Sequence, residues 1–353
     1  MKKLFFIAAI AGAALVGCTK NELAPSVTAQ EEISFAAPVV GVQTKVYGAI
    51  GAAYDTKESF DVWSVWNDAK LGTGTWAGTP YITDKAAKYV PAKVGWAFDP
   101  TYYWPADGYL SFVALSPSIA NVTTYDATNG FKITEWSQGA SETAIVDLMY
   151  SNESRDHEKA MYTSGDNDDN SVYKYTGVDI MFNHALSYLV FKVKTATDYS
   201  ATTKFRLNAI TLSGIYREGN FQQKVGGVTN ADPWTENTSG AIGTYVAYTG
   251  GTLVFDSNVP TDIVPETTGK QIILLPQALV DDQQKLKINY QISTDNGANW
   301  IDQEQEIDLY DGSIKNWEMG KKYTYTLSIS MTEIILDPAV AVWDTTGSGT
   351  LGL

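Results

Sequence analysis

The amino-acid sequence predicts an all-β protein built from β-sandwiches, and three observations support that prediction. Several segments alternate strictly between apolar and polar residues, as expected for strands that bury one face and expose the other. Turn-forming pairs of glycine, asparagine and aspartate separate most of these segments. Helical periodicity is weak, and only Ala140 to Leu148 is compatible with a short helix. Many short strands joined by frequent turns are typical of β-sandwiches.

The clearest predicted strands lie in the second half of the chain. Residues 286–293 and 324–331 alternate without interruption, and residues 189–194 follow the same pattern. Asp295-Asn296-Gly297 is a hairpin-turn signal. We therefore expect the strand at 286–293 to pair with one at Ile301 to Leu309.

The first half begins with a tether that leads into a strand. Asn21 to Glu32 is polar and lacks an apolar period, whereas Ile33 begins an apolar stretch that ends near Lys45. The best domain boundary lies between Ser151 and Gly177, because this segment contains a polar run that cannot be buried. The predicted domains cover residues 33–160 and 175–353.

A secretory signal is predicted at residues 1–17. Lys2 and Lys3 precede an uncharged run, and small residues end it directly before Cys18. The arrangement resembles the lipobox of bacterial lipoproteins, which implies cleavage before Cys18 and a lipid chain on its sulfur. The alternative is an ordinary signal peptide with a chance cysteine. Thr19 follows instead of an acidic residue, which by analogy directs the lipoprotein to the outer membrane.

The composition of the chain argues against nucleic-acid binding, disulfide stabilisation and a membrane-spanning helix. The 353 residues carry a net charge of −15, which repels phosphate backbones, so nucleic-acid binding is not expected. Cys18 is the only cysteine, so the fold must be stabilised by core burial without disulfides. No apolar run reaches the roughly 20 residues that a membrane-spanning helix needs. The mature chain is therefore expected to be soluble apart from its anchor.

No catalytic residue, metal site or cofactor is predicted. Nucleophile-elbow and phosphate-loop motifs are absent, and His157 and His184 are not spaced as zinc ligands. His184 is assigned a structural hydrogen-bonding role. Asp166, Asp168 and Asp169 lack the later glutamate of an EF-hand and are interpreted as a solvated loop. A carboxylate pair for glycoside hydrolysis stays open, because the separation of two carboxylates is a three-dimensional property.

Five tryptophans in the first half raise the question of sugar binding. Their rings would either stack on sugars at the surface or fill a sandwich core, and the core is the favoured interpretation. The five residues are Trp63, Trp66, Trp76, Trp96 and Trp104.

Five short segments together resemble the fimbrillin family, the subunits of type V pili. They occur in the order that the family shows and span most of the chain. The resemblance implies two β-sandwich domains of transthyretin-like or Ig-like type and a structural role without catalysis. The segments are Asp147–Ser151, Phe182–Ser187, Leu212–Ile215, Leu274–Gln277 and Trp317–Tyr323.

The same resemblance implies a maturation step outside the cell. Fimbrillins are exported as lipoproteins, and a trypsin-like protease cuts them after Arg or Lys. The cut removes the lipidated leader with the first strand. The matching bond joins Lys45 to Val46, so residues 18–45 would be the leader and 46–160 the mature first domain. Lys57 is a nearby alternative.

The resemblance also implies that a strand from another subunit fills the groove that the leader vacates. The C-terminal segment 333–353 is the expected donor, because it has its own apolar alternation. Pro338 cannot donate a ladder hydrogen bond, so we expect it to divide this segment into two short strands. The inward-facing residues are expected to be Ile334, Leu336, Val340 and Val342, and the outward-facing ones Asp337, Ala339 and Ala341.

Two functions follow from these observations. The first is a structural subunit of a fimbria, an outer-membrane lipoprotein that joins a homo- or hetero-polymer of fimbrillins at the cell surface and supports adhesion. The second is a surface lipoprotein that binds glycans through the aromatic N-terminal domain. Tip subunits of the fimbrillin family tend to lack a C-terminal donor segment, so the resemblance implies a stalk or anchor position in a pilus.

Overall fold

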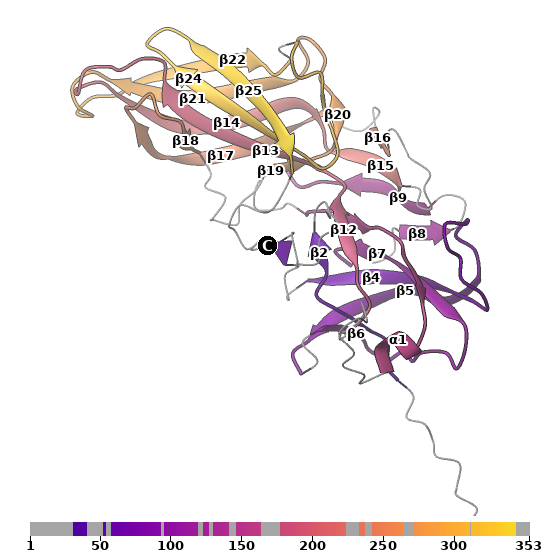
Figure 1. Cartoon of the computed structure of the whole chain (residues 1–353). Helices are drawn as coiled ribbons and strands as arrows, with labels where there is room; N and C mark the ends of the chain where they lie inside the picture. Colours follow the sequence, from indigo (N-terminus) through magenta and orange to yellow (C-terminus); the bar gives the residue numbers. More distant parts are fainter. Residues whose placement is uncertain are drawn as a thin grey trace, which may run out of the picture. The chain divides into compact units, whose positions relative to one another are not determined.

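Nearly all regular structure in the computed structural model of the chain is β-strand (Figure 1). One short helix, α1 (Ala160–Thr163), is the exception among the residues described. The all-β prediction is confirmed. All residues that the structure describes belong to one compact unit that begins at Glu31. The structure describes residues 31–40, 52–53, 58–92, 95–118, 123–126, 130–140, 146–163, 177–223, 233–236, 242–263, 272–310 and 312–343.

A ten-stranded sheet contains most of the first half. Its inner strands β4 (Ser59–Asn67) and β7 (Tyr109–Ser116) are apolar along most of their length, because each face packs into a different core. Phe112 of β7 faces one core and Val113 the other. The strand order is β1 (Ser34–Phe35), β6 (Gly95–Phe98), β5 (Thr79–Val90), β4, β7, β10 (Met149–Ser151), β12 (Met181–His184), β2 (Val39–Val40) and β3 (Ala52–Ala53), and β11 (Ser154–His157) also pairs with β7.

Two further sheets enclose a core in the second half. Alternate residues of β13 (Ser187–Thr195), β24 (Lys321–Ile329), β14 (Lys204–Tyr216) and β21 (Lys285–Ser293) point into it, so the predicted alternation is confirmed. One sheet has the order β18 (Thr261–Asp262), β13, β24 and β25 (Ile334–Val342), with β19 (Ile272–Leu274) also on β13. The other has the order β17 (Ile242–Phe255), β14, β21 and β22 (Ile301–Asp308).

The predicted hairpin between β21 and β22 is confirmed. Asn296 and Gly297 have φ values of 59° and 87°, the left-handed conformation that such turns require. The Asp295 carboxylate accepts hydrogen bonds from the backbone and side-chain amides of Asn299 and from the Ser293 hydroxyl. These bonds, that from the Asn299 backbone first, lower the pKa of Asp295 to about 2.

A four-stranded sheet combines strands from both sides of the predicted domain boundary. Strands β8 (Thr123–Asp126) and β9 (Gly130–Ser137) precede the boundary, whereas β15 (Glu218–Gln223) and β16 (Trp234–Glu236) follow it. β9 pairs directly with β15. A small two-stranded sheet joins β20 (Gln277–Ala278) to β23 (Asn316–Trp317).

The short helix considered for Ala140 to Leu148 does not form at the described positions of that segment, which are Ala140 and residues 146–148. The side chain of Gln138 explains why. Its amide donates to the carbonyl of Val146 at 2.9 Å, and its oxygen accepts from the backbone N–H of Val146 at 3.2 Å. These side-chain bonds take the place of helical backbone bonds at Val146.

Pro338 does not divide the C-terminal segment, and this expectation was wrong. Residues Ile334–Val342 form the single strand β25, in which Pro338 lies opposite Tyr325 of β24. β25 pairs with β24 alone and is an edge strand. Alternate N–H groups of an edge strand point to solvent, so a proline can be accommodated without losing a ladder bond.

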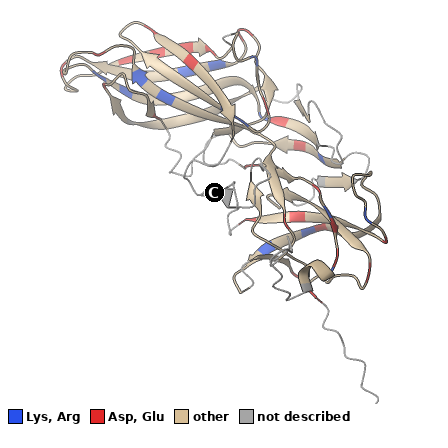
Figure 2. Cartoon of the chain, viewed as in Figure 1, with Lys and Arg blue, Asp and Glu red and all other residues tan. Residues whose placement is uncertain are grey.

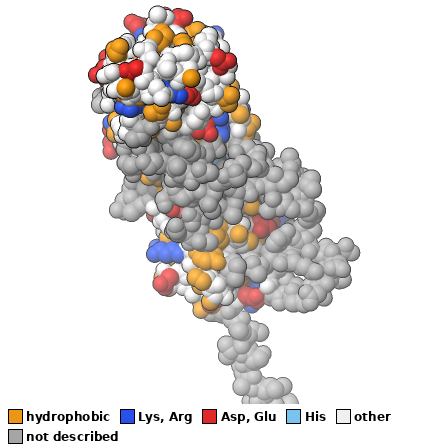
Figure 3. Space-filling view, turned by 90° about the vertical axis from the view of Figure 1, so that its left-hand side faces the viewer, with side chains coloured by type: hydrophobic (Ala, Val, Ile, Leu, Met, Phe, Trp, Pro, Cys, Tyr) orange, Lys and Arg blue, Asp and Glu red, His pale blue; other side chains and the backbone are white. Residues whose placement is uncertain are grey.

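Charged residues are interspersed along the described strands, with Asp and Glu among Lys and Arg (Figure 2). The face drawn in Figure 3 likewise shows hydrophobic side chains scattered among charged and polar ones. No helix in the described part of the chain is long and apolar enough to cross a membrane.

Candidate assembly site

Residues 31–40, here called the leader segment, close the ten-stranded sheet on itself. This segment contributes β1 beside β6 at one end of the strand order and β2 beside β12 near the other. Towards β6, the N–H of Ile33 donates to the carbonyl of Tyr102 at 2.8 Å. Towards β12, the N–H of Val178 donates to the carbonyl of Ser34 at 2.8 Å. The segment therefore satisfies two strand edges at once.

The side chains of the leader segment are anchored in an aromatic core. Phe35 is fully buried, and its ring meets Phe60, Phe98 and Phe112 edge-on at centroid distances of 5.4, 5.5 and 5.7 Å. Ile33 is also fully buried. Full burial of such a side chain is worth roughly 1.5–3 kcal/mol, so these two anchors alone hold the segment firmly.

Gly177 lets the backbone of the leader segment approach closely. A Cβ at this position would lie 2.6 Å from the carbonyl carbon of Phe35 and 2.7 Å from the carbonyl oxygen of Ser34. Both obstructing atoms are backbone, which cannot rotate away. The segment that follows the predicted domain boundary is thus shaped to receive this strand.

The C-terminal strand β25 presents an apolar face that its own sheet covers only in part. Residues directly opposite in an antiparallel pair share a face. Val340 lies opposite buried Tyr323, and Leu336 lies opposite buried Leu327, so both face the core side. Ile334 is buried, but Val340 and Val342 are 52% and 51% exposed. The expected inward direction of these four side chains agrees with the register, although two of them lack cover.

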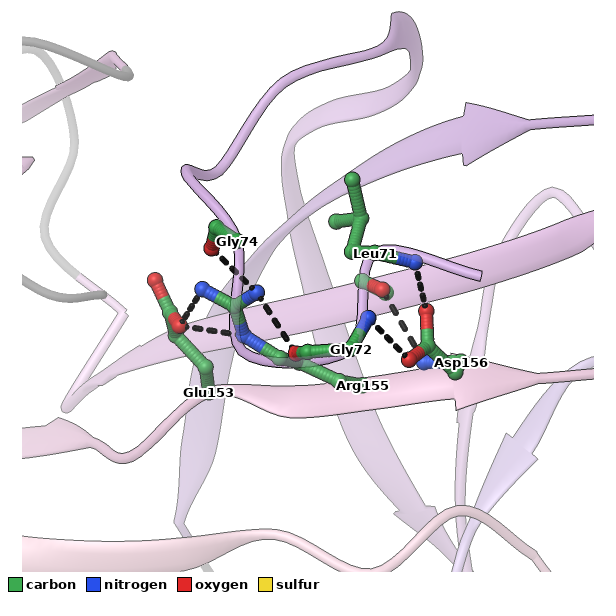
Figure 4. Close-up of polar contacts among 7 residues, drawn as sticks. Leu71, Gly72, Gly74, Glu153, Arg155 and Asp156 are labelled. Atoms are coloured by element: carbon green, nitrogen blue, oxygen red, sulfur yellow. Dashed lines mark hydrogen bonds and ion pairs between the residues drawn. The ribbon is translucent and has the colours of Figure 1, made fainter. Parts of the chain in front are cut away.

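The loop between β4 and β5 is fastened to β11 by two adjacent charged residues (Figure 4). The Asp156 carboxylate accepts the N–H groups of Leu71 and Gly72 at 2.6 and 2.8 Å. The Arg155 guanidinium donates to the carbonyls of Gly72 and Gly74 at 3.0 and 2.7 Å, and it also pairs with Glu153. This loop contains Lys70, so one potential trypsin site lies in a segment held at several backbone groups.

His157 lies in a hydrogen-bonded chain with Ser154 and Tyr162. Its Nε2 lies 2.7 Å from the hydroxyl of Ser154, which donates its own proton to the carbonyl of Asp179. The Tyr162 hydroxyl lies 2.6 Å from Nδ1. Because the Ser154 proton goes to a carbonyl, we assign Nε2–H as the donor to the Ser154 oxygen and Nδ1 as the acceptor from the Tyr162 hydroxyl.

The buried imidazole of His157 makes stability depend on pH. Burial lowers its pKa from 6.5 to about 4, and the neighbouring Asp156 charge opposes this only partly. The folded state therefore favours neutral His157. Its contribution is complete above pH 6.5 and is lost as the unfolded chain takes up a proton between pH 6.5 and about 4.

We expect the unfolding free energy to fall by about 2 kcal/mol between pH 7 and pH 5 on account of His157. Urea unfolding at both pH values measures this fall. His157→Gln removes the titrating group. The unfolding free energy of this variant should therefore fall by about 2 kcal/mol less between pH 7 and pH 5 than that of the unchanged protein, whatever the variant's stability at pH 7. An equal fall in both proteins would contradict the assignment.

A family model described as fimbrillin-like matches residues 44–343. The chain belongs to the fimbrillin-like family. Comparison with curated proteins gives no match.

Solved structures show where else this fimbrillin-like fold occurs. A fimbrial protein from Bacteroides vulgatus is 16% identical with a TM-score of 0.58, and the match covers 88% of this chain and 99% of that one. A proposed cell adhesion protein from Bacteroides uniformis is 17% identical with a TM-score of 0.50, over 89% and 99% of the two chains. Another from Bacteroides ovatus is 13% identical with a TM-score of 0.50, over 89% and 98%. At these identities the likeness concerns the fold alone.

Several predicted positions of this fimbrillin-like chain lie outside the described residues. They include Cys18, the Lys45–Val46 bond and the alternative at Lys57, as well as Asp166, Asp168 and Asp169. In the described part, no group of three or more His, Cys, Asp or Glu side chains is placed to hold a metal ion.

The tryptophans and His184 lie where the core interpretation expects them. Four of the five tryptophans are buried, and Trp66 is half-buried with its indole N–H donated to the carbonyl of Asp107 at 2.9 Å. Buried rings cannot offer flat faces to a sugar. His184 bonds to Asp147, which confirms its predicted hydrogen-bonding role.

Sequence reasoning missed two parts of the site. One is the strand partner of the leader segment at residues 178–182, which comes from beyond the predicted boundary. The other is Trp343, which directly follows β25 and is buried. Gly177 was the available signal for the first, because a glycine before an apolar run can mark close backbone approach.

Proposed function

We propose that this fimbrillin-like chain is a structural subunit of a cell-surface fimbria that polymerises by donor-strand exchange after its leader has been removed. The observation that carries the proposal is the leader segment. It bonds to two strand edges and places Phe35 in an aromatic core, yet it lies between the predicted lipid anchor and Lys45. A cut after Lys45 would open both edges and their pocket.

Strand edges opened in this way are templates for another chain. Unpaired N–H and C=O groups beside β6 and β12 would accept a strand in trans, and the vacated Phe35 position would accept an apolar side chain. β25 supplies a candidate donor, because Val340 and Val342 are apolar, face one way and are only half covered. Full burial of these two side chains would contribute at most roughly 3–6 kcal/mol before association costs.

The pairing of β2 favours Lys45 over Lys57 as the cleavage position. Val39 and Val40 of β2 pair with Ala53 and Ala52 of β3. A cut after Lys45 removes β2 and leaves β3 with the mature subunit, whereas a cut after Lys57 removes both strands. Retention of β3 keeps a strand from the same subunit beside the opened groove.

Limited trypsin digestion of the lipid-free protein tests the proposal. We expect a compact product that begins at Val46, identified by N-terminal sequencing, and filaments in the electron microscope after digestion but not before it. A product that begins elsewhere, or one that stays monomeric at high concentration, would count against donor-strand exchange after Lys45.

The proposed lipid anchor has a test of its own. Cys18→Ser should abolish lipidation completely, because Cys18 is the only cysteine in the chain. Incorporation of a labelled fatty acid in the bacterial host measures this, with the unchanged protein as control. Label that persists on the Cys18→Ser protein would contradict the lipoprotein assignment.

A further inference from the structure

Trp343 anchors the end of the C-terminal strand. It directly follows β25 and is only 3% exposed, unlike Val340 and Val342 just before it. Its ring lies flat on the imidazole of His184, with centroids 3.5 Å apart and planes 8° from parallel. Its backbone N–H donates to the carbonyl of Gly320 at 2.9 Å. The half-exposed end of β25 is therefore followed directly by a firmly packed ring.

The ring of Trp343 covers a buried polar pair. Nδ1 of His184 lies 3.0 Å from the carboxylate of Asp147, and both side chains are 2% exposed. Among the described residues, Nε2 of His184 has no hydrogen-bond partner. An unsatisfied buried polar atom costs free energy that water would restore if the ring moved away. The stack is therefore stabilised by packing but opposed by the desolvation of the group beneath it.

The same strand that carries His184 also holds the leader segment. β12 is four residues long, and its first two, Met181 and Phe182, pair with Val39 and Val40 of β2. His184 ends the strand. Loss of the leader segment would strip one edge of β12 and leave it paired with β10 alone. β12 thus contacts both the leader segment and Trp343.

We propose that the stack of Trp343 on the Asp147–His184 pair is an assembly lock. It holds β25 in its own sheet while the leader segment supports β12, and it loosens when the leader segment is removed. A strand that is freed only after cleavage cannot enter the groove of a second copy too early. This inference rests on the proposed function, because the lock would determine when β25 becomes free to act as the donor strand.

Hydrogen exchange of the β25 amides tests the lock without reference to filaments. The protein is the full chain with Cys18→Ser, before and after trypsin. In the uncut protein, Trp343→Ala should speed exchange in β25 by about tenfold or more, because a large buried aromatic contact is lost. Trp343→Phe retains a stacking ring and should restore most of the protection. Trp300→Ala is the matched control, since Trp300 lies at the β21–β22 hairpin against Arg206, and it should leave β25 unchanged.

Cleavage alone should also speed exchange in β25 of the protein with Trp343 intact, measured on the freshly cut monomer before filaments form, because a donated β25 would be protected again in a groove. Unchanged β25 exchange in uncut Trp343→Ala would overturn the lock, and unchanged exchange after cleavage would overturn its coupling to the leader segment. If exchange responds as expected but no filaments form, the proposed function fails while the lock stands. If filaments form but exchange in β25 does not respond, the lock fails while the proposed function stands.

Discussion

Replacing Lys45 by alanine should leave a folded monomer that forms almost no filaments. The leader segment would stay covalently attached, with Phe35 in its aromatic pocket and both strand edges paired. A donor from another subunit would then compete with a tethered strand whose effective concentration is in the millimolar range or higher. We expect filament yield after protease treatment to fall by about tenfold or more.

Electron microscopy of protease-treated Lys45→Ala measures that yield, and circular dichroism checks the fold. Lys45→Arg is the matched control, because a trypsin-like protease accepts either basic residue. Normal filaments from Lys45→Ala would mean that the cut lies elsewhere or is not needed. Lys57→Ala would then tell these two outcomes apart.

Replacing Val340 and Val342 together by serine should shorten filaments strongly with little effect on the monomer. Both side chains are about half exposed in β25, so the monomer loses only part of their burial energy. In a groove, each would contribute about 1.5–3 kcal/mol. Ala339→Ser with Ala341→Ser is the matched control on the opposite face of the same strand. Filament length by electron microscopy and thermal unfolding of the monomer are the two measurements.

Equal filament lengths for the two double variants would show that β25 does not occupy a groove, and the donor would then have to be sought at the new N-terminus. Substitution is a cleaner test than deletion of the whole segment. Ile334 is 6% exposed and belongs to the core of its own sheets, so its removal would unfold part of the acceptor as well.

The sequence predicted correctly those features that depend on interactions between neighbouring residues. The alternation in β21 and β24 and the turn at Asp295 to Gly297 depend on neighbouring residues, and they appear as expected. The apolar run of β7 carries no alternation, because both of its faces are buried. Such a run identifies a buried strand but not its partners.

Contacts between residues far apart in the sequence could not be predicted from local patterns. The leader segment meets Val178 and β12, about 140 residues away along the chain, and no turn or spacing encodes that contact. The role of Trp343 was hidden for the same reason, since its partner His184 lies in another sheet. Pro338 was misjudged because the rule that excludes proline from strands applies to inner strands, and β25 is at an edge.

The parallel pairing of β13 with β24 bears on how such a polymer would carry load. The two strands run side by side from Tyr188 opposite Lys322 to Thr195 opposite Ile329. In the proposed fibre, joined through donated C-terminal strands, tension would enter each subunit at the end of β24, and a pull along the axis of β24 would load its pairing with β13. The hydrogen bonds to β13 then resist in shear, all together, instead of opening one by one as in the peeling of a hairpin. A subunit built in this way would stretch little before it yields.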